Sequence, residues 1–154
     1  MSIAASLARA WRIAADIADP ELPMLSIADL GILRDVRWDD GTVSVLITPT
    51  YSGCPAMSAI ADDITAAFAA AGIAPVHVRR VLAPAWSSDW ITPAGRRKLA
   101  AAGIAPPTPG SAPIACPRCA SMETAMLSPF GTTACRALWR CRACGEPFDR
   151  FKCH

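Results

Sequence analysis

TVSVLITPTYSGCPAM, residues 42 to 57, decides the fold of the first part of the chain. Val43, Val45 and Ile47 alternate with smaller or more polar side chains, which predicts a β-strand whose apolar side chains share one face. A polar loop follows and ends at Cys54. Pro55 suits the first position of a helix, because proline lacks the N–H group that this position leaves unpaired. The stretch therefore predicts a strand, a loop and a helix, with a single thiol where loop and helix meet.

The neighbouring stretches extend this unit on both sides. ILRDVRW precedes Asp-Asp-Gly, a good hairpin turn, so it predicts a second strand paired with residues 42–48. Further elements follow from periodicity and capping: a helix over 3–18, a capped turn from Ser26 to Asp29, a helical stripe from Met57 to Phe68, a strand over 76–82, and a helix from Pro93 to Gly103. The predicted fold class is α+β, with a small three-stranded sheet packed with helices, followed by a C-terminal four-cysteine zinc ribbon.

A change in composition divides the chain of 154 residues. GIAPPTPGSAPI, residues 103–114, has four prolines in twelve residues, which predicts a semi-rigid linker. The expected domains are an α+β domain over 1–102, this linker, and a small module over 115–154 that holds six of the seven cysteines.

Two C-x-x-C units mark the small module. CPRC (116–119) and CRAC (141–144) are separated by 21 residues, and each unit turns two sulfurs to one side of a tight knuckle. The predicted metal ligands are Cys116, Cys119, Cys141 and Cys144, holding a structural zinc ion in a closed tetrahedron. Iron could occupy the same four-sulfur site. Cys135, Cys153 and His154 remain, and they are better explained as packing or terminal residues than as ligands.

Charge and hydropathy limit the classes of partner. The net charge of +2 is too small to predict binding to nucleic acid or a membrane surface, and no apolar run spans a bilayer. Residues 115–154 contain six basic and three acidic side chains, and four thiolates on a divalent ion reduce this balance to about +1. Nucleic acid is therefore the weaker alternative for the ribbon. Paired cysteines that serve as ligands favour a reducing compartment, the cytoplasm.

Cys54 has three interpretations: a packing residue, a reactive nucleophile or a metal ligand. At the predicted N-cap of a helix its thiolate would be favoured by free N–H groups and the helix dipole. A nucleophile needs a base, and the one histidine before the linker, His77, is expected on a solvated strand face. One cysteine cannot hold iron alone, so a ligand role would be transient and shared with a second copy or a client protein. Asp29, Glu21, Thr48 and Thr50 could line the same pocket, although capping and turn formation explain Glu21 and Thr50 better.

Longer motifs connect the chain with known families. DPELPMLSIADLGILRDV together with TPTYSGCPAM resembles the α+β domain of MIP-type and SufT-like iron–sulfur assembly proteins, over roughly residues 10–82. PAWSSDWIT, the Gly-Ile-Ala-Pro-Pro linker, FGTTAC and EPFDRFKCH extend the likeness over most of the chain. As a whole it is similar to the PaaD family, also lettered PaaJ, of proteins that belong to bacterial phenylacetyl-CoA epoxidase complexes.

The resemblance implies an accessory, non-enzymatic role in aerobic phenylacetate degradation. It implies that Cys54, with Asp29 and Thr48, handles iron or an iron–sulfur cluster for the di-iron oxygenase or its iron–sulfur reductase. Other epoxidase subunits or the reductase would be the partners, and a homodimer stays open. The alternative is a structural, non-catalytic subunit that handles no metal. A thiol-redox protein and a nucleic-acid-binding ribbon are further alternatives.

Overall fold

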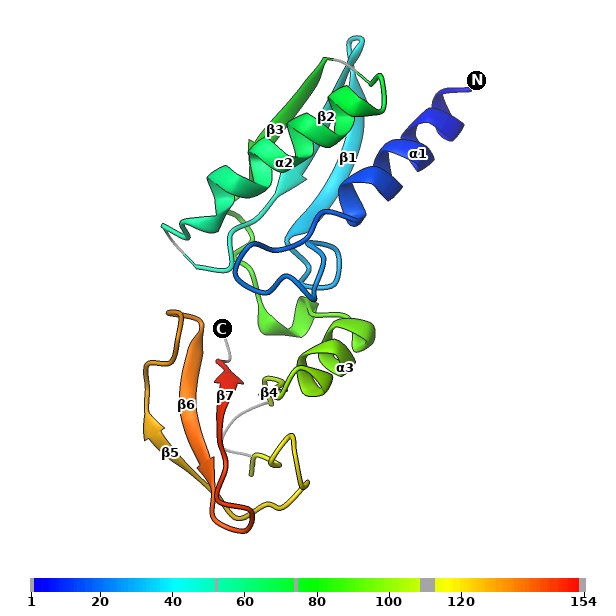
Figure 1. The fold of residues 1–154 in the computed structure, drawn as a ribbon. Helices are drawn as coiled ribbons and strands as arrows, with labels where there is room; N and C mark the ends of the chain where they lie inside the picture. The colour runs from blue at the N-terminus through cyan, green and yellow to red at the C-terminus, as the bar shows by residue number, and fades with distance from the viewer. Residues whose placement is uncertain (1, 52, 74, 109–112, 153–154) are drawn as a thin grey trace. The chain divides into compact units, whose positions relative to one another are not determined.

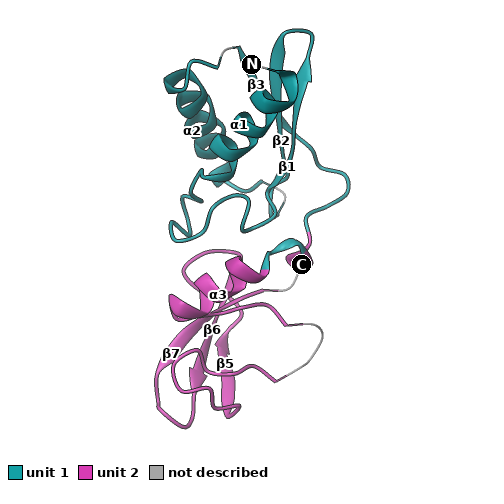
Figure 2. Ribbon diagram, turned by 90° about the vertical axis from the view of Figure 1, so that its right-hand side faces the viewer, with its two compact units in different colours: residues 1–86, 90–92 teal, residues 87–89, 93–154 magenta. Residues whose placement is uncertain are grey.

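The computed structural model describes residues 2–51, 53–73, 75–108 and 113–152, and divides them into two compact units (Figures 1 and 2). Unit 1 comprises residues 1–86 and 90–92, and unit 2 comprises residues 87–89 and 93–154. The α+β fold class with a C-terminal cysteine ribbon is confirmed. None of the helices in the described ranges is both long and apolar enough to cross a membrane.

Unit 1 is built on a three-stranded sheet in the order β1-β2-β3. β1 (Leu33–Asp39) pairs antiparallel with β2 (Thr42–Ile47), and β3 (Val76–Arg80) pairs parallel with β2. A parallel pair needs a crossover, and α2 (Ala56–Ala70) provides it. α1 (Ile3–Ala15) packs against β1 and α2, and Figure 2 shows both helices on one side of the sheet.

The core of unit 1 follows the predicted periodicities. Val43, Val45 and Ile47 of β2 are buried, as is the predicted stripe along α2, formed by Met57, Ile60, Ile64 and Phe68. Helix α1 is shorter than the predicted range 3–18 because Ala18 leaves the helix and forms a β-bridge with Ser26. Strand β3 likewise ends at Arg80 and not at residue 82.

The turn after Ser26 is fixed by the predicted reciprocal cap. The Asp29 carboxylate accepts from the Ser26 N–H at 3.0 Å, and the Ser26 hydroxyl accepts from the Asp29 N–H at 3.0 Å. Gly31 ends the turn with φ +73°, and a Cβ there would lie 2.6 Å from the Cβ of Trp90. Only glycine fits this close approach. The turn therefore holds residues 86–92 of unit 1 against the start of β1, an attachment that the Trp86 N–H to Leu30 oxygen bond (2.8 Å) reinforces.

Unit 2 contains a four-stranded sheet in the order β4-β7-β6-β5. Its strands are β4 (Ile104–Ala105), β5 (Thr124–Ser128), β6 (Arg136–Cys141) and β7 (Pro147–Phe151), preceded by α3 (Pro93–Ala101). β5, β6 and β7 form an antiparallel meander. A short 3-10 helix, η1 (Ser88–Trp90), lies at the division between the two units in the sequence.

The proline-rich segment differs from a free spacer. Ile104 and Ala105 pair parallel with β7 and are buried, and Ile114 is buried in the core of unit 2. Carbonyl oxygens of Pro107 and Thr108 accept from Arg96 and Arg150. Unit 2 thus includes α3 and the described part of 103–114, where the sequence pattern predicts the end of the first domain and a linker. Residues 109–112 of that predicted linker lie outside the described ranges.

Candidate functional site

The four cysteines of the two C-x-x-C units come together in unit 2. All four sulfurs lie within 4.8 Å of one another, with 3.8 Å between Cys116 and Cys144 and 3.5 Å between Cys119 and Cys141. Four sulfurs held tetrahedrally at about 2.3 Å from a zinc ion would be about 3.8 Å apart. The donor set and its spacing therefore fit a four-coordinate metal site with no position left for a substrate.

Two equivalent knuckles build this site. In the first, the Ala120 N–H donates to the Cys116 oxygen, and in the second the Gly145 N–H donates to the Cys141 oxygen. Ala120 and Gly145, each directly after the second cysteine of its unit, both have positive φ, 63° and 79°. This left-handed residue turns the chain so that both sulfurs of a unit face the same point.

Backbone N–H groups prepare the sulfurs for a cation. The Arg118 N–H donates to the Cys116 sulfur, and the Cys144 N–H donates to the Cys141 sulfur at 3.5 Å. The Cys144 N–H lowers the pKa of the Cys141 thiol to about 7, because it stabilises the thiolate. Metal binding requires thiolates, so this bond favours the ligand form of Cys141.

The leftover cysteine of the ribbon is a packing residue in the described chain. Cys135 is buried, its sulfur lies 3.0 Å from the Thr133 hydroxyl, and it is no member of the four-sulfur group. Cys153 and His154 lie outside the described residues, so their predicted packing or terminal role stays a prediction. His77 lies exposed on β3, as the strand pattern predicts.

Cys54 lies at the start of α2 in unit 1, and its predicted N-cap position is wrong. The N-cap is Pro55, and no side chain caps this helix. Cys54 is buried, with 8% of its surface exposed, and burial is the main cause that raises the pKa of its thiol. The Ala56 N–H opposes this shift, but one N–H group does not outweigh the loss of solvent. The expectation of an easily ionised thiol is therefore also wrong for the free protein.

Two carboxylates act on the Cys54 thiol. After burial and the Ala56 N–H, the negative charge of Glu21 raises the pKa further, Thr50 lowers it by a hydrogen bond, and Asp19 raises it. Asp19 holds the loop 19–22 by accepting from the N–H groups of Glu21 and Leu22 at 2.9 and 2.8 Å. Sequence reasoning missed Asp19 and undervalued Glu21 and Thr50, although Glu21 follows directly on Asp19-Pro20 in the resembling motif.

The other two residues predicted beside Cys54 have different surroundings. The Asp29 carboxylate is engaged in the cap with Ser26, and Asp29 is 9% exposed. Thr48 is buried, and its hydroxyl has no hydrogen-bond partner among the described residues. Thr48, Thr50 and Tyr51 line a hollow of about 260 Å³ together with Trp86. The participation of Asp29 and Thr48 in metal handling stays a prediction.

Replacing Glu21 by glutamine is expected to speed alkylation of Cys54. The substitution removes a negative charge that raises the thiol pKa, so at any pH between 7 and about 9 more thiolate is present. Iodoacetamide labelling followed by mass spectrometry of the Cys54 peptide measures this rate. Glu123→Gln, an exposed carboxylate in unit 2, should leave the rate unchanged. A slower or equal rate in Glu21→Gln would show that this carboxylate does not act on the thiol.

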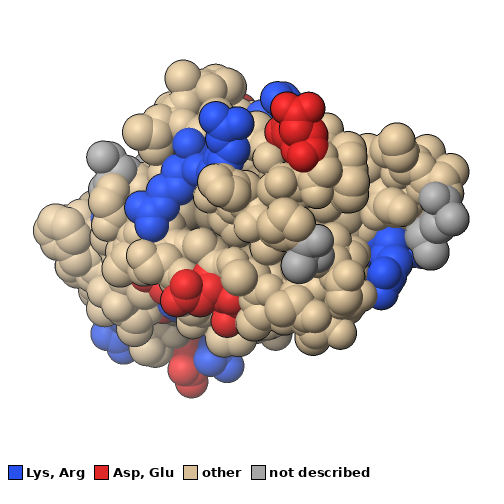
Figure 3. Space-filling model, turned by 90° about the horizontal axis from the view of Figure 1, so that it is seen from above, with Lys and Arg blue, Asp and Glu red and all other residues tan. Residues whose placement is uncertain are grey.

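Surface charge gives little support to nucleic-acid binding. On the face that Figure 3 shows, basic and acidic side chains are interspersed among neutral ones and form no continuous basic surface. Arg136 of β6 is already paired with Asp149 of β7 at 3.2 Å. Phosphate backbones are bound by clustered basic side chains, so nucleic acid remains the weaker alternative.

Comparisons with known proteins agree with both sites. Residues 105–152 match the family model described as "PaaD zinc beta ribbon domain", and residues 12–81 match the model described as "Iron-sulfur cluster assembly protein". A protein from Escherichia coli (strain K12), named as a subunit of 1,2-phenylacetyl-CoA epoxidase, is 47% identical over 150 residues, covering 93% of this chain and 90% of that one. The chain belongs to the PaaD family of phenylacetyl-CoA epoxidase proteins.

Solved structures support the fold of this PaaD family member. A domain of unknown function from Bacillus anthracis aligns with 62% of the chain and 92% of its own length, with a TM-score of 0.58 and 24% identity. At that identity the likeness shows the fold alone. A conserved hypothetical protein from Thermotoga maritima is 29% identical over 58% of the chain and 89% of its own length, with a TM-score of 0.48.

Proposed function

We propose that the chain is an accessory maturation factor of the phenylacetyl-CoA epoxidase system, which helps to install iron or an iron–sulfur cluster in the oxygenase or its reductase. It acts in the cytoplasm and catalyses no reaction of its own. The observation that carries the proposal is the union, in one chain, of an iron–sulfur assembly domain over residues 12–81 with the ribbon of the PaaD family over 105–152. The E. coli relative is named as a subunit of the epoxidase, which indicates where the partners belong.

The surroundings of Cys54 favour a cation over a free thiolate. Glu21 and Asp19 disfavour the negative thiolate, but the same carboxylates attract a positive ion. An iron ion that approaches this thiol would compensate the carboxylate charge and take the place of the proton. A raised thiol pKa with nearby carboxylates thus suits iron handling and opposes a thiol-redox role, which needs an acidic thiol.

The handling of iron at Cys54 would be transient. Among the described residues, the four ribbon cysteines are the group that brings three or more candidate ligands close together. Cys54 has no preformed set of that kind, so the client protein would supply further ligands and then keep the iron. The ribbon cysteines would hold a resident zinc ion, whose role is to stabilise unit 2.

Metal analysis of the chain purified without air tests this division of labour. We expect about one zinc ion per chain in the wild type and in Cys54→Ala, because the zinc ligands lie in unit 2. Iron beyond the zinc is expected in the wild type alone. Equal iron in both proteins would show that Cys54 does not handle it.

A structural subunit that handles no metal is the second candidate. The burial of Cys54 and its raised pKa favour this candidate, because both reduce the reactivity of the thiol in the free protein. The two candidates differ in what the epoxidase lacks when Cys54 is replaced: the maturation factor predicts missing iron, and the structural subunit predicts full iron.

A further inference from the structure

Strand β5 of unit 2 is an edge strand with exposed apolar side chains. It pairs with β6 on one side, and no other strand of the described chain pairs with its second side. Met126 and Leu127 are 54% and 56% exposed, and Met122 and Phe130, just beyond the two ends of the strand, are 54% and 71% exposed. An edge strand with unpaired backbone groups and apolar side chains is a template for another extended segment.

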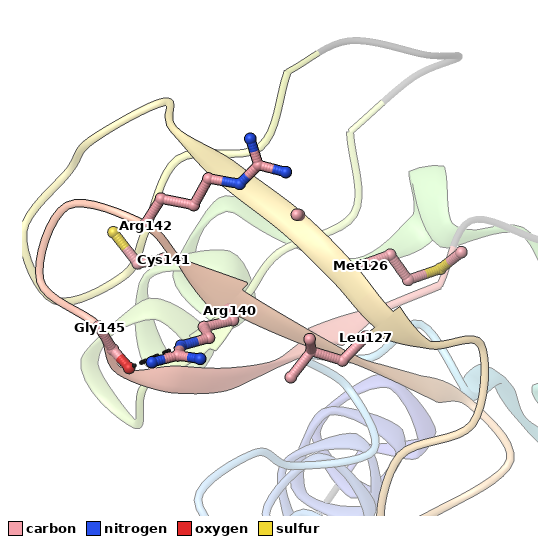
Figure 4. Close-up of a pocket in the computed structure, with 7 residues that line it drawn as sticks. Met126, Leu127, Arg140, Cys141, Arg142 and Gly145 are labelled. Atoms are coloured by element: carbon pink, nitrogen blue, oxygen red, sulfur yellow. Dashed lines mark hydrogen bonds between the residues drawn. The ribbon is translucent and has the colours of Figure 1, made fainter.

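The outer face of the β5–β6 pair carries a basic hollow. A pocket of about 500 Å³ is lined by Ala125, Met126 and Leu127 of β5, and by Arg140 and Arg142 from β6 and the turn after it (Figure 4). Ala125 pairs directly with Arg140, so their side chains share one sheet face. The hollow is therefore apolar along β5 and positively charged along β6.

The two arginines of the hollow have charge to offer a partner. Arg140 donates from Nε to the Gly145 oxygen at 3.2 Å, the contact drawn in Figure 4, and neither Arg140 nor Arg142 has an ion-pair partner among the described residues. The remaining N–H donors of both guanidinium groups can bind carboxylates. By contrast, Arg136, also on β6, is already engaged with Asp149.

We propose that β5 is the docking edge for an extended segment of a partner protein in which acidic and apolar side chains alternate. The segment would add to the sheet as a strand beside β5, place its acidic side chains against Arg140 and Arg142, and place its apolar side chains against Met126 and Leu127. That the partner is an epoxidase subunit or the reductase rests on the proposed function; the chemistry of the segment does not.

Charge complementarity selects this occupant over two others. A second copy of the chain would bring the same two arginines to the shared edge, where like charges repel. A nucleic acid would find two arginines beside an exposed apolar strand without aromatic side chains among the residues that line the hollow. An acidic and apolar strand satisfies the arginines, the apolar side chains and the unpaired edge together.

The test uses the full-length chain and a synthetic peptide of alternating glutamate and valine, followed by NMR of the backbone amides. We expect the peptide to shift the amides of Thr124–Ser128, and Arg140→Glu together with Arg142→Glu to weaken its Kd at least about tenfold. Arg97→Glu, an exposed arginine of α3, is the matched control and should change the Kd less than about twofold. A lysine–valine peptide should not bind.

Several results would overturn the docking proposal. These are unshifted β5 amides, equal binding of the lysine–valine peptide, undiminished binding by the double variant, a wild-type dimer joined through β5, or tighter binding of an oligonucleotide at the same amides. A folding control is the metal content of the double variant, which should equal that of the wild type.

Retention of purified epoxidase subunits and reductase on the immobilised chain separates this proposal from the proposed function. We expect Cys54→Ala to retain its partner like the wild type and the double arginine variant to lose it. If Cys54→Ala cells make fully iron-loaded epoxidase, the maturation function fails while the docking edge stands. If the double variant retains every partner that the wild type retains, the docking edge fails while Cys54 is unaffected.

Discussion

Cells that carry Cys54→Ala are expected to show at least about tenfold less phenylacetyl-CoA epoxidase activity than wild-type cells, at equal amounts of every subunit. Cys54 is the one cysteine before residue 116, so no other thiol of the assembly domain can replace it. The substitution removes a sulfur from a buried position and leaves a small apolar side chain, which should cost about 1 kcal/mol in the free energy of unfolding. The loss would therefore reflect chemistry and not an unfolded protein.

Two variants serve as controls for this experiment. Cys135→Ala removes another buried thiol, in unit 2 and outside the four-sulfur group, and should leave epoxidase activity within about twofold of wild type. Cys54→Ser keeps the size of the side chain but not the thiolate, and should resemble Cys54→Ala. Full activity in both Cys54 variants would favour the structural subunit over the maturation factor.

Replacing Cys141 by alanine is expected to abolish metal binding in the ribbon and to unfold unit 2. Cys141 is fully buried and belongs both to the four-sulfur group and to the core cluster with Cys116, Ile114 and Phe148. Structural zinc sites contribute about 10–16 kcal/mol of binding free energy, more than a small core supplies. Zinc per chain should fall below about one tenth of wild type, and limited proteolysis should cut within residues 113–152 first.

Unit 1 should survive this change, because its core is formed by its own sheet and helices. Cys135→Ala is again the matched control and should keep its zinc, since its sulfur is no ligand. Undiminished zinc in Cys141→Ala would show that the four sulfurs are not the ligands. Iron in place of zinc in the wild type would change the metal but not the ligand set.

Local patterns predicted most of the fold. Alternation identified β2, helical spacing identified α2, and the Ser26–Asp29 cap was correctly predicted, because each depends on neighbours within a few residues. The two C-x-x-C units similarly predicted the cluster of four sulfurs, since their spacing fixes each knuckle locally.

What the sequence could not predict depends on burial and on distant contacts. The helix signal at Pro55 suggested a reactive cap for Cys54, but packing of the preceding loop buries the thiol and raises its pKa. Glu21 lies 33 positions before Cys54, and only the fold brings its charge to the thiol. The prolines of 103–114 hid the pairing of Ile104 and Ala105 with β7, which depends on a strand more than forty residues further along.

The iron content of the epoxidase made in Cys54→Ala cells tests the central claim most directly. The oxygenase and the reductase would be purified without air from wild-type and variant cells, and iron per subunit measured in each. The maturation function predicts that one of the two proteins is deficient in iron in the variant and recovers activity when iron or a cluster is restored chemically. Full iron in both proteins from the variant cells would contradict it.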